Sequence, residues 1–169
     1  MSEIAFIVLA RAIHVMSGVT WAGAAFVLAM VIAPIMVPKG SDIPSPRLGT
    51  VARRAGALGG ISAVLTVLSG VFLFAVLHPH DNSLSGLVLK SGATAALLSL
   101  AVGLLIGRPA GIEVARLHAG RDGAAFSQEM IQRLSQLRTR TVMSARVAAA
   151  LLAVAVLAMA VFRYAAAVG

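Results

Sequence analysis

Residues 146–168 read RVAAALLAVAVLAMAVFRYAAAV, and their composition indicates the class of protein. After Arg146 its one charged residue is Arg163, and nearly all the others are apolar. About 20 helical residues cross a hydrocarbon core of about 30 Å, so the stretch is long enough to span a membrane. Its Ala, Leu and Val content, with no alternation of polar and apolar residues, favours helix over strand. It predicts a transmembrane helix.

Three further stretches have the same character. Of the 169 residues 59% are hydrophobic and only 12% are charged, whereas soluble domains carry about 25% charged residues. The start of the chain lacks a basic n-region, so we expect the first helix to be retained rather than cleaved. We predict one all-α domain over residues 1–169, an integral membrane four-helix up-and-down bundle without an internal repeat. The predicted spans are approximately 4–37, 55–77, 87–107 and 146–168.

Prolines are expected to end three of these helices. Proline lacks an N–H and its ring clashes with the preceding helical turn. Pro34 and Pro38 should therefore end the first helix, Pro79 the second and Pro109 the third.

Basic residues predict the orientation. The connections 37–56 and 108–146 hold eleven of the fourteen Lys and Arg residues. The positive-inside rule places both connections in the cytoplasm and both termini outside. The net charge of +8 then reflects membrane topology and not nucleic-acid binding, because the arginines flank apolar spans. The absence of cysteine excludes disulfides and thiolate metal sites.

The second basic connection has a pattern of its own. Phe126, Met130, Leu134 and Leu137 recur at helical spacing. They predict an amphipathic cytoplasmic extension before the last span, which lies on anionic headgroups or runs straight into that span. A helix that docks a partner is the alternative.

Polar side chains from all four predicted helices fall at one depth, just beneath the outer surface. Ionisable residues inside membrane spans are costly, so each is a functional candidate. Each candidate also has an explanation that involves no chemistry. The core histidine could hydrogen-bond a neighbouring backbone, the cations could snorkel to the headgroups, the loop histidines could be solvated, and the tryptophan could pack the core. The small and polar residues Ser62, Thr66, Ser69 and Gly70 are expected to serve close helix packing. The candidates are Arg11, His14, Trp21, His78, His80, Lys90, Met159, Arg163 and Tyr164.

A neutral imidazole at this depth is a suitable axial ligand for haem iron, so His14 is the first candidate ligand. Arg11 and Arg163 could pair with haem propionates, because guanidinium matches carboxylate in a bidentate fashion. The second ligand stays open among four residues. These are Lys90, His78, His80 and Met159.

Copper is the alternative metal. Imidazole and thioether both suit copper, so His14 with His78, His80 or methionines could form such a site. The seven methionines lack a clustered Met-x-x-Met spacing, which counts against it. A cofactor-free accessory subunit of a membrane complex is a third hypothesis.

The text Arg11-Ala-Ile-His14-Val-Met-Ser-Gly18-Val-Thr-Trp21-Ala-Gly23 resembles the opening of the CopD/HemJ superfamily of small four-helix bacterial membrane proteins. The resemblance extends over nearly the whole chain through short motifs. The end of the first helix, Val31-Ile-Ala-Pro34-Ile-Met, is closer to the CopD type. The further motifs are Arg53-Arg54, Ser69-Gly70, Leu89-Lys90, and Met159-Ala160 with Arg163-Tyr164.

The resemblance implies that the protein lies in the bacterial inner membrane and has one of two kinds of function. CopD-type proteins are linked to copper uptake or resistance. HemJ-type proteins bind haem b through a first-helix His, depend on a third-helix Lys, and act as protoporphyrinogen oxidases. His14 and Lys90 match those two positions. A quinone or a redox protein as electron partner, and a homodimer, complete the expectations.

Overall fold

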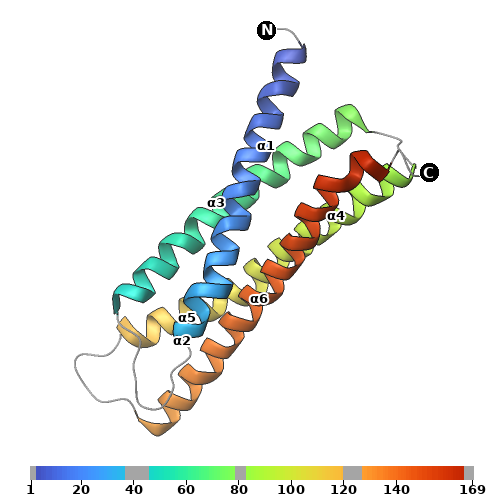
Figure 1. Cartoon of the computed structure of the whole chain (residues 1–169). Helices are drawn as coiled ribbons and strands as arrows, with labels where there is room; N and C mark the ends of the chain where they lie inside the picture. Colours follow the sequence, from blue (N-terminus) through green and yellow to red (C-terminus); the bar gives the residue numbers. More distant parts are fainter. Residues whose placement is uncertain (1–2, 37–45, 79–82, 120–126, 166–169) are drawn as a thin grey trace.

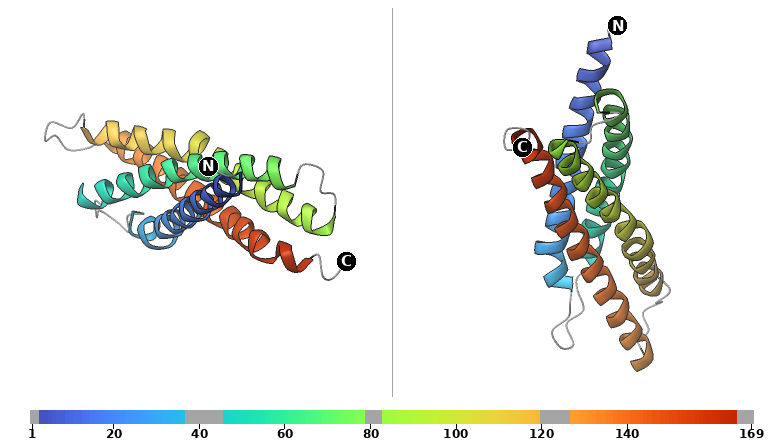
Figure 2. Two further views of the ribbon diagram at one scale, coloured as in Figure 1. Left: turned by 90° about the horizontal axis from the view of Figure 1, so that it is seen from above. Right: turned by 90° about the vertical axis from the view of Figure 1, so that its right-hand side faces the viewer.

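The computed structural model describes residues 3–36, 46–78, 83–119 and 127–165 (Figure 1). All regular structure in these ranges is helical. Four long rods cross one another at moderate angles, and both ends of the chain lie toward the same side of the molecule (Figures 1 and 2). In chain order the elements are α1 (Glu3–Phe26), η1 (Val27–Ile32), α2 (Ala33–Met36), α3 (Pro46–Leu77), α4 (Leu84–Val102), η2 (Gly103–Gly107), α5 (Arg108–Ala119) and α6 (Gln128–Ala165).

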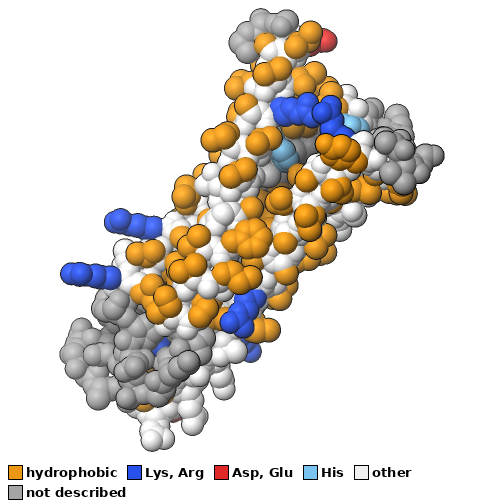
Figure 3. Space-filling view, viewed as in Figure 1, with side chains coloured by type: hydrophobic (Ala, Val, Ile, Leu, Met, Phe, Trp, Pro, Cys, Tyr) orange, Lys and Arg blue, Asp and Glu red, His pale blue; other side chains and the backbone are white. Residues whose placement is uncertain are grey.

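Four helices in the described ranges are long and apolar enough to cross a membrane. Only 17% to 28% of the most apolar window of each is buried inside the protein. Hydrophobic side chains therefore cover most of the surface between the ends, as Figure 3 shows for one face. Such a surface suits lipid and not water. The prediction of an all-helical protein with four candidate membrane spans is confirmed.

The predicted helix end at Arg108-Pro109 is wrong, whereas the first helical run ends at Met36, next to its predicted end at about residue 37. Helical structure continues past Pro34 into α2 and past Pro109 into α5. A π-helical turn precedes each proline and removes the conflict: Ala33 N–H bonds Leu28 O, and Arg108 N–H bonds Gly103 O. Each bond reaches back five residues, the pattern of a π turn, and local adjustments of this kind let membrane helices accommodate proline.

Two helices also begin earlier than expected. α3 begins at Pro46 instead of about residue 55, and α6 begins at Gln128 instead of about residue 146. α6 is continuous to Ala165, and α5 packs along its first part. Of the expected amphipathic positions, Leu134 is buried, while Phe126 lies outside the described residues.

The helices form two pairs that meet at one tryptophan. α1 packs mainly along α3, and α4 packs mainly along α6. Trp21 is only 8% exposed and lies in a core cluster to which every long helix contributes. Its neighbours in the cluster are mostly alanine, so small side chains on three helices make room for one large ring. The other buried members are Ala63, Ala95, Ala96, Leu152 and Ala155.

The two pairs are built alike, although the sequence shows no repeat. In each, a helix with a π turn before a proline is followed by a long helix running back. The first helices of the two pairs can be aligned so that Pro34 matches Pro109, and the second helices can be aligned by one constant offset. In this alignment, contacts within the first pair match contacts within the second. The contact of Ala24 with Gly59 falls on that of Ser99 with Ala148, and the contact of Ser17 with Thr66 falls on that of Gly92 with Ala155.

Candidate functional site

His14 is held against α3 by a hydrogen bond to the backbone. Its Nδ1 lies 2.9 Å from the carbonyl oxygen of Thr66 and 3.3 Å from the hydroxyl of Ser69. A carbonyl oxygen can only accept, so Nδ1 carries the proton and donates it. Nε2 of the neutral ring then keeps its lone pair. Among the described residues Nε2 has no hydrogen-bond partner.

This arrangement is the one that metal-binding histidines use. A ligating imidazole donates its second N–H to a carbonyl or carboxylate, which fixes the tautomer and the ring orientation. His14 is half-buried. It therefore combines a fixed tautomer with an available nitrogen, as an axial ligand of haem requires.

Gly70 provides the surface on which the His14 ring rests. A Cβ at position 70 would lie 2.8 Å from Cε1 and 3.2 Å from Nδ1 of the ring. Real Cβ atoms do not approach other atoms this closely, so any side chain here would displace the imidazole. The Ser69-Gly70 step thus gives the ring both a hydroxyl neighbour and a flat contact surface.

Hydroxyl groups extend this contact one turn deeper. Thr66 Oγ1 lies 2.9 Å from Ser17 Oγ, and Ser17 Oγ donates to the carbonyl of Ile13 at 2.6 Å. Both hydroxyl-bearing residues are buried. The contact between α1 and α3 is therefore polar over two turns, and we call it the α1–α3 polar seam. It consists of His14, Ser17, Thr66, Ser69 and Gly70.

The other candidates lie at a comparable level of the second pair. Relative to the Trp21 cluster, His14 lies two turns outward, Lys90 about one and a half turns beyond Ala95, and Met159 about one turn beyond Ala155. These steps correspond to rises of about 10, 8 and 6 Å. Lys90 and Met159 are both half-buried. α1 and α4 share at most marginal contact, so His14 and Lys90 belong to different helix pairs.

His78 lies apart from His14. It follows α3 and contacts two aromatic rings: it stacks on Phe74, with centroids 6.4 Å apart, and meets Phe162 edge-on, with centroids 6.3 Å apart. It is just over two turns beyond Gly70, a rise of about 12 Å. Two nitrogen ligands of one metal ion lie within about 4 Å of each other. In this arrangement His78 joins α3 to α6 and does not reach a metal held by His14.

Basic side chains mark the outer end of the site. Arg11 and Arg163 are exposed and lie about one turn outward of His14 and Met159 respectively. Figure 3 shows Lys or Arg side chains beside histidine side chains at the end of the molecule near the N-terminus. Tyr164 is 74% exposed, and Trp21 is buried two turns deeper than His14. His80 lies outside the described residues.

Residues 3–36, 46–78, 83–119 and 127–165 contain no group of three or more His, Cys, Asp or Glu that could hold a metal ion. The arrangement thus offers a single imidazole nitrogen with cations near it.

Sequence reasoning identified His14 and missed what holds it. The acceptor is the backbone oxygen of Thr66, and because every residue has such an oxygen, the residue type gives no sign of this role. Ser69 and Gly70 were interpreted as packing residues, yet both touch the imidazole. The available signal was a polar residue next to a glycine on the helix that faces His14.

Comparisons with known proteins add no further assignment. No protein-family model, no curated protein and no solved structure matches the chain. Fold and site define an all-helical protein with four helices able to span a membrane and one oriented histidine between two of them.

Proposed function

We propose that this protein is a membrane-integral b-type haem protein in which Nε2 of His14 is an axial ligand. The observation that carries the proposal is the hydrogen bond from Nδ1 of His14 to the carbonyl of Thr66 at 2.9 Å. It orients the ring so that, in the neutral form, Nε2 is the nitrogen that carries the lone pair and can coordinate a metal.

The surroundings of His14 support the same proposal. Haem b, when bound, supplies one-electron redox chemistry at its iron. Arg11 and Arg163 are exposed at the outward end, where guanidinium groups can pair with propionate carboxylates. Lys90 and Met159 are the remaining candidates for the second axial position, since both lie at the level of His14 on the facing pair.

The basic connections support the membrane orientation. Basic residues at the start of α3 and on α5 and α6 lie opposite the His14 end. With that side cytoplasmic, both termini face the periplasm of a bacterial inner membrane and His14 lies near the periplasmic face. The role that fits is electron transfer at that face, with a quinone or a redox protein as partner.

The test is an absorption spectrum of the purified protein, oxidised and then reduced with dithionite, with metal analysis of the same sample. We expect a Soret band, a reduced α-band and about one iron per chain. The substitution His14→Ala should abolish both bands and leave a folded helical protein. His78→Ala is the matched control: it makes the same change in a half-buried histidine and should keep the haem.

A full haem complement in His14→Ala would contradict the proposal. Copper without a Soret band would replace it with the copper-protein hypothesis, and a protein with neither metal would favour an accessory subunit. Circular dichroism of both variants shows whether a lost spectrum reflects a lost ligand or a lost fold.

A further inference from the structure

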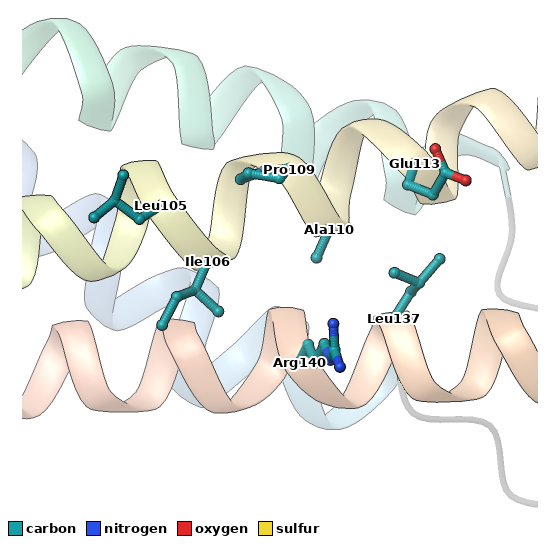
Figure 4. A pocket seen from close by; sticks show the side chains of 7 residues that line it. All are labelled: Leu105, Ile106, Pro109, Ala110, Glu113, Leu137 and Arg140. Atoms are coloured by element: carbon teal, nitrogen blue, oxygen red, sulfur yellow. The ribbon is translucent and has the colours of Figure 1, made fainter.

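A pocket lies at the opposite end of the molecule from His14. It is open to the surface, has a volume of about 500 Å³, and lies between the end of the α4–η2–α5 rod and α6 (Figure 4). Leu105 and Ile106 lie at one end of it, Glu113 and Leu137 lie toward the other, and Arg140 lies between them near Ala110. The lining residues are Leu105, Ile106, Pro109, Ala110, Glu113, Leu137 and Arg140.

The depth of the pocket matches the edge of a bilayer. About 20 helical residues cross the hydrocarbon core, so α4 leaves it near Gly103 and α6 enters it near Arg146. Leu105 and Ile106 therefore lie at the hydrocarbon boundary. Arg140 lies about 9 Å farther out, within the headgroup layer.

The charges of the pocket leave one cation available to a ligand. Glu113 forms an ion pair with Arg133, with 3.0 Å between Oε1 and NH2, so its negative charge is already matched. Arg140 is exposed and forms no ion pair with the described residues. Arg108 and Arg116 on α5 are exposed as well, so the surroundings are basic.

We infer that this pocket binds one anionic phospholipid from the adjacent leaflet. Its acyl chain lies against Leu105 and Ile106, and Arg140 pairs with its phosphate. Leu105 and Ile106 lie toward the membrane centre and Arg140 lies farther out, which matches a phospholipid whose acyl chains lie in the membrane and whose anionic phosphate lies toward water. A soluble anion would have no use for the aliphatic end. The inference concerns another part of the molecule than His14 and does not depend on haem.

The test compares lipid binding by native mass spectrometry of the full-length protein released from detergent. Phosphatidylglycerol and phosphatidylcholine of identical acyl chains are the probes. We expect one phosphatidylglycerol to bind more tightly than phosphatidylcholine, and Arg140→Gln to reduce that preference about fivefold, the usual effect of one cation at a headgroup. Arg140 is exposed, so the variant should fold like the parent.

Arg47→Gln is the matched control. Arg47 is an exposed arginine at the start of α3, on the same side of the membrane but outside the pocket. It should leave the preference unchanged. Equal losses in the two variants would overturn the inference, since they would reflect general surface attraction. Displacement of the lipid by millimolar inorganic phosphate would also overturn it, because the acyl chain would then contribute nothing.

Discussion

The two helix pairs share one plan and differ in what fills their outer halves. Between α1 and α3 the contact is the α1–α3 polar seam, with a histidine ring lying on Gly70. Between α4 and α6 the equivalent contact is a backbone approach at a glycine without an imidazole. A Cβ at Gly92 would lie 2.8 Å from Cβ of Ala158 and 3.3 Å from the carbonyl oxygen of Ala155.

The comparison shows that glycine has two different roles in these helix pairs. Gly92 lets two backbones approach, as small residues do in membrane helix pairs. Gly70 makes room for a side chain that must keep one orientation. The second pair therefore contributes close packing to the fold, and the first pair holds the group with chemistry.

The largest effect is expected where the two pairs meet. Trp21→Ala removes a ring that is 8% exposed from a cluster lined mainly by alanine, and alanines cannot move in to fill the space. Large-to-small changes of this kind cost about 3–5 kcal/mol. We expect a loss of that size in the free energy of unfolding, measured by denaturant titration in detergent micelles.

A conservative change provides the control for Trp21. Trp21→Phe keeps most of the ring volume and should lose less than half as much stability. Equal losses for the two variants would show that an indole-specific contact, and not the filling of space, holds the pairs together.

The next effect tests the second pair. In Gly92→Ala the new methyl meets the Cβ of Ala158 and the carbonyl of Ala155, neither of which can rotate away. The helices must separate, so we expect a cost of about 1–3 kcal/mol. Thermal unfolding followed by circular dichroism measures it. An unchanged midpoint would mean that α4 and α6 are less closely packed than described.

The four spans are predictable because the length and hydropathy of a segment do not depend on how the segments pack together. Prediction from the sequence fails at Pro109 because a broken helix would expose backbone groups to lipid, which costs more than a π turn. The early start of α6 was predictable in part, since the helical spacing of Met130, Leu134 and Leu137 indicates a helix that could run straight into the last span.

The candidate site was predictable only in part. A histidine inside an apolar span is rare, so His14 is visible from sequence alone. Its contact with Thr66 depends on how α1 and α3 cross, which no residue pattern specifies. The second ligand stays a prediction, because Lys90 and Met159 both lie at a suitable level. His78 is the clearest gain from the structure: its aromatic neighbours and its distance along α3 separate it from His14.

Of these substitutions, the one with the smallest expected effect on stability should have the largest effect on haem binding. In Gly70→Ala the new methyl meets the far end of the His14 side chain, which can rotate, so the fold should lose less than in Gly92→Ala. The rotation breaks the bond to Thr66, and we expect the Soret band to shift or disappear.

Gly60→Ala is the control, because its Cβ would meet nothing within 4 Å; it should gain about 0.5–1 kcal/mol in helix stability and keep its spectrum. If Gly70→Ala instead kept the parent spectrum, the orientation of His14 by the α1–α3 polar seam would be irrelevant to haem binding, and the two pairs would differ in packing alone.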